Sequence, residues 1–301
     1  AEACDALDVP YLHIGTDEVQ FTNPQFVPEM VAFVRSKGKK VISWNPGWQY
    51  KKGEIDMTQL WSYRGKAQPG IPAIDCRFHY ANHFDNYADL VALFNSRIYN
   101  KPMGSDDLAG CIIAFWNDRY IDNTRQLLDE NNFYPYMLTL AERAWRGGGR
   151  GYFDGKTTLL WDDEPEQKAE FAEFENRMLW HKQHTLKGLP FSYERQADVE
   201  WRITDAFPNN GNLQMSFPPE EHLAAVGMPA TDVKSYEYNG KTYNSRTITG
   251  NGIYLRHVWG TLVPEFYKDP KENSTAYATR WIYSKKARTA KLSLEFQNYS
   301  R

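Results

Sequence analysis

The stretch Val9-Pro10-Tyr11-Leu12-His13-Ile14-Gly15-Thr16-Asp17-Glu18 joins a short apolar run to two adjacent carboxylates. Its composition favours a buried strand from Val9 to Gly15, with the carboxylates at the carboxyl end of that strand. In parallel α/β folds, catalytic side chains collect at that end. Neighbouring carboxylates push each other's pKa values apart, so one can stay ionised while the other holds a proton. Taken alone, however, the pair is more typical of a solvated acidic turn.

Strand and helix patterns alternate on either side of this stretch. Asn23-Pro24 is typical of a helix start, and Gly38 of a helix end. The predicted fold class is α/β, with about five strands of a parallel sheet where a closed (β/α)8 barrel needs eight. The other strands are expected over 41–44, 59–62, 73–77 and 110–116, and the other helices over 87–94, 134–145 and 164–184.

The pattern changes after Pro190. Asn239-Gly240 lies between tyrosine-rich flanks and predicts a hairpin. From Ala290 to Phe296, apolar and polar residues alternate strictly, which is typical of a half-buried strand. We therefore expect two domains: an α/β unit over residues 1–192 and a β-sandwich-like accessory domain over residues 193–301.

Composition excludes several classes of protein. The 301 residues carry 35 Lys+Arg and 38 Asp+Glu, a net charge of −3, which disfavours nucleic acid as a partner. No apolar stretch reaches the roughly 20 residues of a membrane span. Three widely spaced cysteines indicate buried thiols rather than a disulfide framework or a zinc cluster. The 10 Trp and 19 Tyr residues are compatible with sugar binding, because such side chains combine a flat apolar face with a polar group.

Three of the tryptophans stand at the ends of predicted strands. Trp44, Trp61 and Trp116 each follow an apolar strand pattern, as the carboxylate pair does. Any one of them alone would be expected in the core. Because the carboxyl ends of parallel strands meet at one edge of the sheet, the three together predict a single aromatic pocket beside Asp17-Glu18.

These residues carry a resemblance to a known family. The motif from His13 to Glu18, of the form His-x-Gly-x-Asp-Glu, resembles the signature of the family 20 glycoside hydrolases, the β-N-acetylhexosaminidases. The order of Trp44, Trp61 and Trp116 is similar to that family's aromatic pocket. Ala141-Glu142-Arg143-Ala144-Trp145 is similar to its last barrel helix. The resemblance covers roughly residues 9–150 and implies that residues 1–192 are the second half of a (β/α)8 barrel with an appended helix.

The resemblance also implies a mechanism, one of the substrate-assisted exceptions to the usual two-carboxylate scheme. Glu18 would be the general acid and base, and the substrate's own 2-acetamido oxygen would be the nucleophile. Asp17 would orient the acetamido N–H and stabilise the developing positive charge. Tyr80, or alternatively Tyr87, would bind the acetamido carbonyl, while the three tryptophans would wall the sugar. The implied partner is a glycan ending in N-acetylhexosamine, and no metal or organic cofactor is implied.

The chain departs from the family pattern in three respects. Asn82 stands where the family commonly has Asp, and Asp118 stands where it commonly has Glu. Both positions would bind the far hydroxyls of the terminal sugar, so the departures bear on hexose choice. The family's first three barrel strands and their sugar-binding Arg have no counterpart here, so we expect the missing half of the barrel as a partner.

Two alternatives to the hydrolase remain. The substitutions at Asn82 and Asp118 also allow a non-catalytic glycan-binding protein on a degenerate hydrolase scaffold. A metal hydrolase using His13 and Asp17 is the third and weakest hypothesis. Enzymes that degrade glycans in this way are often exported, which favours a periplasmic or extracellular location.

Overall fold

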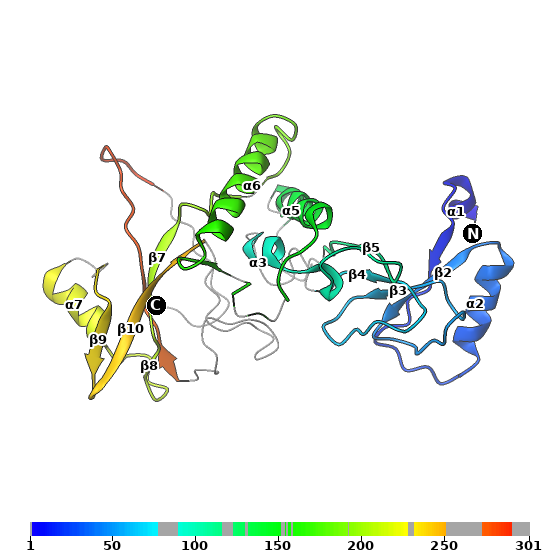
Figure 1. The fold of residues 1–301 in the computed structure, drawn as a ribbon, viewed down its shortest axis with the longest axis horizontal. Helices are drawn as coiled ribbons and strands as arrows, with labels where there is room; N and C mark the ends of the chain where they lie inside the picture. The colour runs from blue at the N-terminus through cyan, green and yellow to red at the C-terminus, as the bar shows by residue number, and fades with distance from the viewer. Residues whose placement is uncertain are drawn as a thin grey trace.

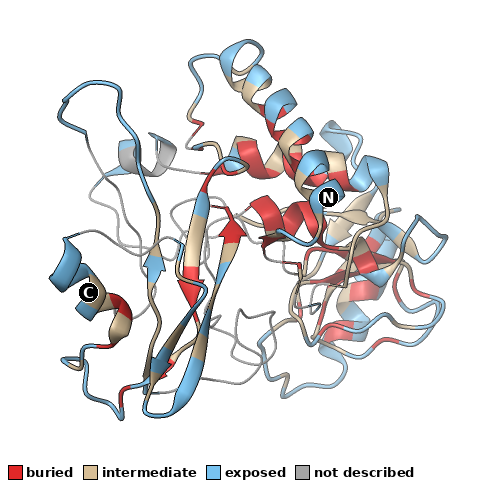
Figure 2. Ribbon diagram, turned by 60° about the vertical axis from the view of Figure 1, so that its left-hand side comes forward, coloured by how far each residue is buried: buried red, intermediate tan, exposed pale blue. Residues whose placement is uncertain are grey.

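A computed structural model describes residues 2–77, 90–115, 123–129, 132–151, 154, 156–157, 159–191, 193–227, 232–250 and 273–290. The described part has three regions along its long axis: a parallel sheet, a central group of helices and an antiparallel sheet (Figure 1). Buried residues concentrate in the parallel sheet and on the inner sides of the central helices (Figure 2).

The parallel sheet has the strand order β1-β2-β3-β4-β5, so every strand pairs with its neighbour in the sequence. This confirms the predicted α/β class and the presence of five parallel strands, each of which overlaps a predicted strand. The described residues form an open sheet and not a closed barrel. The strands are β1 (Tyr11–His13), β2 (Lys40–Asn45), β3 (Met57–Leu60), β4 (Ala73–Asp75) and β5 (Leu108–Cys111).

β5 differs from the expected strand over 110–116, because it begins earlier and ends at Cys111. The register with β4 shifts between Ala73 and Ile74, and Gly110 has a φ of 152°. Such an irregularity inserts an extra residue and ends regular pairing early. A glycine permits it because Gly110 has no Cβ to clash at that φ.

Helix α2 (Phe26–Ser36) covers one face of this sheet. The expected start at Asn23-Pro24 is correct to within a turn, and Asn23 Oδ1 accepts a hydrogen bond from the Gln25 N–H at 2.9 Å. The apolar positions of α2 recur at helical spacing and pack against β2 and the loops that follow it. The buried residues of this cluster are Val27, Val31, Val34, Val41, Tyr50, Ile55 and Ile71.

Three central helices form the largest core. They are α3 (Leu90–Asn95), α5 (Phe133–Arg146) and α6 (Pro165–Gln183), and each matches a predicted helix. Phe94 of α3 packs against Phe171 and Phe174 of α6, with ring centroids 5.3 and 5.2 Å apart. Shorter elements nearby are α1 (Glu2–Ala6), the 3-10 helix η1 (Ile98–Asn100) and α4 (Thr124–Asp129).

The antiparallel sheet has the order β12-β7-β10-β6, and β9 pairs with β10 through the predicted Asn239-Gly240 hairpin. A second, two-stranded sheet pairs β8 with β11. The strand expected from Ala290 lies almost wholly outside the described residues. The elements are β6 (Leu160–Trp161), β7 (Glu200–Thr204), β8 (Phe207–Pro208), α7 (Pro218–Val226), β9 (Ser235–Tyr238), β10 (Lys241–Thr249), β11 (Ser274–Thr275) and β12 (Ala278–Thr279).

β6 comes from the α/β part of the chain, yet it pairs with β10 of the antiparallel sheet. The α/β part of the chain therefore contributes one strand to the antiparallel sheet. None of the helices in the described ranges has the length and apolar character needed to cross a membrane.

Candidate functional site

Asp17 and Glu18 lie in the loop directly after β1, at the carboxyl edge of the parallel sheet. Asp17 is half-buried and Glu18 is exposed. The loop has an unusual backbone, with positive φ at Gly15 (79°), Thr16 (85°) and Glu18 (49°). A β-branched residue such as Thr16 rarely adopts this conformation, and it persists only where surrounding contacts hold it.

His13, the last residue of β1, begins the support of this loop. Its Nδ1 accepts a hydrogen bond from the Gly15 N–H at 3.1 Å, and its ring centroid lies 4.6 Å from that of Trp44. Partial burial of the imidazole lowers the pKa of His13, and the nearby Asp17 charge opposes that shift. An Nδ1 that accepts a hydrogen bond belongs to a neutral imidazole, in agreement with the direction of this shift.

Two of the three predicted site tryptophans, Trp44 and Trp61, are within the described residues and stand at the ends of the next two strands. Trp44 is the fifth residue of β2 and is half-buried on the face opposite Val41 and Ser43. Trp61 directly follows β3, and its indole Nε1–H donates to the Pro46 carbonyl at 2.8 Å. Because β1, β2 and β3 are adjacent and parallel, Asp17, Glu18, Trp44 and Trp61 all lie along the same edge of the sheet.

We call the segment after β1 that carries Asp17 and Glu18 the acidic loop. Three buried hydroxyls support it, and we call them the hydroxyl cluster: Thr16, Ser43 and Tyr50. Ser43 Oγ donates to the Gly15 carbonyl at 2.6 Å and accepts from the Tyr50 hydroxyl at 2.9 Å. Thr16 Oγ1 lies 2.7 Å from Ser43 Oγ and accepts the Trp48 N–H at 3.3 Å. Burial raises the pKa of Tyr50, so its phenol remains a donor.

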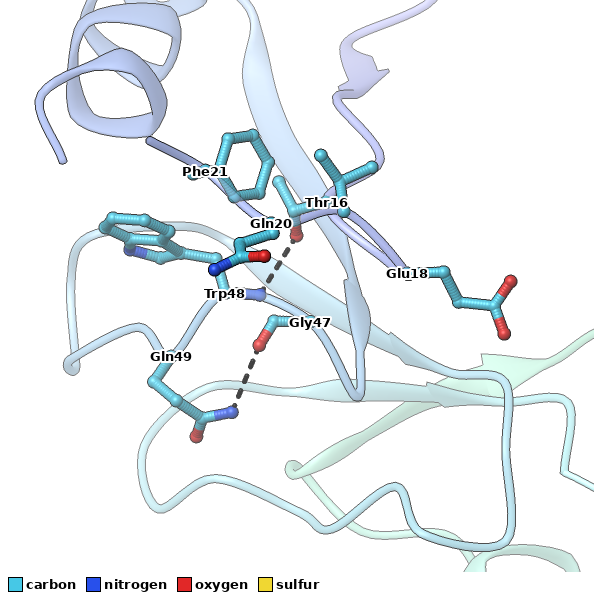
Figure 3. Close-up of a pocket in the computed structure, with 8 residues that line it drawn as sticks. Thr16, Glu18, Gln20, Phe21, Gly47, Trp48 and Gln49 are labelled. Carbon is cyan, nitrogen blue, oxygen red and sulfur yellow. Dashed lines mark hydrogen bonds between the residues drawn. The ribbon is translucent and has the colours of Figure 1, made fainter. Parts of the chain in front are cut away.

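The loop after β2 fits closely against the acidic loop. A Cβ at Gly47 would lie 2.7 Å from the Trp44 carbonyl oxygen and 2.8 Å from that of Thr16, so only glycine allows the approach. Between the two loops is an open pocket of about 540 Å³. The Glu18 carboxylate points away from the side chains of Trp48 and Gln49 (Figure 3). The pocket is lined by Thr16, Glu18, Val19, Gln20, Phe21, Gly47, Trp48 and Gln49.

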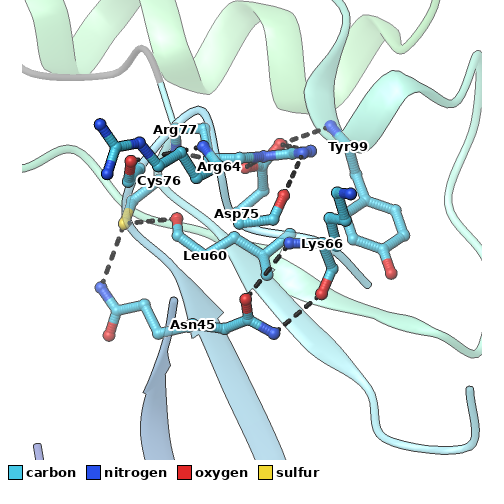
Figure 4. Close-up of polar contacts among 11 residues, drawn as sticks. Asn45, Leu60, Arg64, Lys66, Asp75, Cys76, Arg77 and Tyr99 are labelled. Carbon is cyan, nitrogen blue, oxygen red and sulfur yellow. Dashed lines mark hydrogen bonds and ion pairs between the residues drawn. The ribbon is translucent and has the colours of Figure 1, made fainter. Parts of the chain in front are cut away.

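A second buried polar group orders the loops after β3 and β4 (Figure 4). Asn45 Nδ2 donates to the Lys66 carbonyl at 2.8 Å. Asp75 accepts from Arg77 Nε at 2.8 Å and from the Tyr99 N–H at 2.6 Å. Burial raises the pKa of the Cys76 thiol to about 11, so this cysteine is a poor nucleophile.

The remaining predicted site residues lie outside the described residues: Tyr80, Asn82, Trp116 and Asp118. Ser43 and Tyr50 are not among the residues predicted for the site from the sequence. A signal for Ser43 existed, because it is a polar residue inside the otherwise apolar run Val41-Ile42-Ser43-Trp44.

A scan against models of known protein families finds no match to the chain, and a search of curated proteins finds none either. Within the described ranges, no three His, Cys, Asp or Glu side chains gather as a metal site would require. The interpretation of the site therefore depends on its own geometry and on the sequence motifs.

Proposed function

We propose that this protein is a retaining exo-β-N-acetylhexosaminidase that removes terminal GlcNAc or GalNAc from glycans. The observation that carries the proposal is the shared edge of the sheet. Asp17 and Glu18 follow β1, while Trp44 and Trp61 stand at the ends of the next two strands. Two carboxylates beside two indoles supply acid–base groups next to flat apolar surfaces, which suits a sugar substrate.

The fold also supports this proposal. The strand order follows the sequence without reversal, and all five strands are parallel. Doubly wound sheets reverse their strand order at a switch point, whereas a (β/α)8 barrel does not. We therefore assign the parallel sheet to the second half of such a barrel, in which carboxyl-end loops carry the catalytic residues.

In the proposed mechanism, Glu18 gives its proton to the glycosidic oxygen as the bond from that oxygen to C1 breaks. The 2-acetamido oxygen of the substrate attacks C1 and forms an oxazolinium intermediate. Glu18 then takes a proton from water, whose oxygen attacks C1 and reopens the ring with overall retention. Asp17, as an anion, accepts the acetamido N–H and stabilises the positive charge of the intermediate. The chemistry needs neither a metal nor an organic cofactor.

The test is hydrolysis of 4-nitrophenyl N-acetyl-β-glucosaminide by the 301-residue chain together with the half of the barrel that it lacks, because the chain alone is expected to be incomplete. We expect turnover of this substrate and none of the matching β-glucoside, because the glucoside lacks the acetamido nucleophile. Glu18→Gln should lower kcat/KM by about 10²- to 10⁴-fold, the usual contribution of a general acid–base group. Glu29→Gln, which removes an exposed carboxylate from α2, is the matched control.

Equal turnover of the glucoside would overturn substrate assistance, and wild-type rates in Glu18→Gln would overturn the role of Glu18. A chain that binds N,N′-diacetylchitobiose but turns over neither substrate would be the alternative, a non-catalytic glycan-binding protein. Calorimetric titration with that disaccharide distinguishes this outcome from a chain that does not bind glycans.

A further inference from the structure

We propose that the hydroxyl cluster of Thr16, Ser43 and Tyr50 is a positioning device that sets where Asp17 and Glu18 stand relative to Trp44. The inference rests on the function proposed above, and it assigns a role to three residues that have no chemical part in the proposed mechanism. The first support is burial: Ser43 is fully buried, Tyr50 is 6% exposed and Thr16 is 8% exposed.

The direction of each hydrogen bond in the cluster follows from its chemistry. A serine hydroxyl has one hydrogen and two lone pairs. The Ser43 hydrogen goes to the Gly15 carbonyl, so Thr16 must donate to Ser43 Oγ. With the Tyr50 donor added, Ser43 uses its full capacity. One directed chain then runs from the Trp48 N–H through Thr16 and Ser43 to the Gly15 carbonyl.

This series of hydrogen bonds joins the two loops that carry the proposed site. One end is the backbone of Gly15, two residues before Asp17, and the other is the backbone of Trp48 in the loop after β2. The Trp44 N–H also donates to the Gly15 carbonyl at 3.0 Å. The positive φ of Thr16 is therefore held from three sides: by Ser43, by Trp48 and by the close approach of Gly47.

β3 provides a matched control. Thr58 pairs with Ser43 in the sheet register, lies on the same face and is fully buried, but its hydroxyl has no hydrogen-bond partner among the described residues. Thr58→Val thus removes a buried hydroxyl without touching the cluster. Thr16→Val removes a cluster hydroxyl at nearly constant volume, while Thr16→Ser keeps that hydroxyl and should rescue the function.

The experiment measures kcat and KM with 4-nitrophenyl N-acetyl-β-glucosaminide, and amide hydrogen exchange over residues 14–18 and 44–48. For Thr16→Val and Ser43→Ala we expect kcat to fall about 10- to 100-fold, with KM changed by less than about threefold. Exchange over both segments should rise. Thr58→Val should match the wild type in both readouts, and Tyr50→Phe should have a smaller effect because it removes only one donor.

The outcomes separate the two proposals. If the wild type turns over substrate and Thr16→Val behaves as Thr58→Val does, the positioning role is wrong and the hexosaminidase proposal stands. If the wild type has no turnover, the functional proposal fails. Amide hydrogen exchange then still decides whether the hydroxyl cluster holds the acidic loop. Unchanged exchange in Thr16→Val and Ser43→Ala would overturn the positioning role. If Ser43→Ala does not fold, the comparison of Thr16→Val with Thr16→Ser is sufficient for the test.

Discussion

The protonation of His13 reports on the position of the Asp17 charge in the proposed site. His13 lies between Trp44, which packs against its ring, and Asp17, whose charge acts on it. Partial burial lowers the pKa of His13, whereas an anionic Asp17 raises it, and burial is the larger of the two effects. The pKa of His13 is therefore a probe of where the Asp17 charge stands.

We predict that Asp17→Asn moves the pKa of His13 further below its usual value of 6.5, because the substitution removes the charge that opposes burial. Titration of the His13 ring protons by NMR measures the shift. Glu29→Gln makes the same change in net charge on the exposed side of α2 and should leave the titration unchanged. An unchanged or raised pKa in Asp17→Asn would place the Asp17 carboxylate away from the His13 ring.

The same residue contributes to the pH dependence of stability. Because folding lowers its pKa, the folded state binds fewer protons than the unfolded state in the window between the two pKa values. The contribution of His13 to stability is present above about pH 6.5 and is lost as pH falls through the lowered folded value. More than a third of the residue is exposed, so the effect should be small.

At the scale of elements, the sequence predicts what periodicity and turn chemistry encode. The strands around Leu12 and Val41, the helix from Phe133 and the Asn239-Gly240 hairpin all form as expected. Periodicity identifies which face of a strand is buried but not which loop folds over its end. The polar Ser43 inside an apolar run marks an unusual position, but the backbone groups that Ser43 and Asp75 bind were not predictable.

Arg143 is a second residue whose hydrogen-bond partners could not be predicted from the sequence pattern. The adjacent, oppositely charged residues Glu142 and Arg143 predict an ion pair on the helix, but Arg143 instead donates to the carbonyls of Phe94 and Gly147, at 2.7 and 2.6 Å. Burial of the guanidinium, together with the neighbouring Arg146 charge, lowers the pKa of Arg143 to about 10. Glu142 pairs with Arg177 of α6 instead. Only the packing of α5 against α3 and α6 decides between these partners.

Glu175 anchors α6 to the segment that follows it, and its loss should destabilise the protein. Its fully buried carboxylate accepts from the Tyr193 hydroxyl at 2.5 Å and from the Gln196 and Ala197 N–H groups at 2.5 and 3.1 Å. Glu175→Gln replaces an accepting oxygen with a donor that faces these donors. We expect a loss of about 3 kcal/mol in the free energy of unfolding, measured by urea denaturation.

The control for this prediction lies on the same helix. Glu173 makes an exposed ion pair with Arg177, so Glu173→Gln should cost at most about 1 kcal/mol. Equal losses in the two variants would mean that the buried hydrogen bonds of Glu175 contribute no more than a surface ion pair. Neither residue lies near the acidic loop, so the comparison does not depend on the proposed function.

At the scale of the whole molecule, two adjacent leucines join the α/β part to the antiparallel sheet. Leu159 packs with Ile203 and Ile248 of that sheet. Leu160, the first residue of β6, packs into the core of the central helices, which includes Phe171. Successive side chains of an extended segment point to opposite faces, so one short segment is buried in both cores at once.

This connection predicts that both parts unfold in one cooperative transition. Leu159→Ala and Leu160→Ala each leave a cavity in a different core, and each should cost about 2–5 kcal/mol. If the cores are coupled, both variants lower the midpoint of a single urea transition, and far-ultraviolet circular dichroism and tryptophan fluorescence coincide throughout. Leu223→Ala, at an exposed position of α7, should leave the midpoint unchanged. Two separate transitions, each shifted by only one of the core variants, would instead show that the two parts unfold independently. In that case β6 would not couple them.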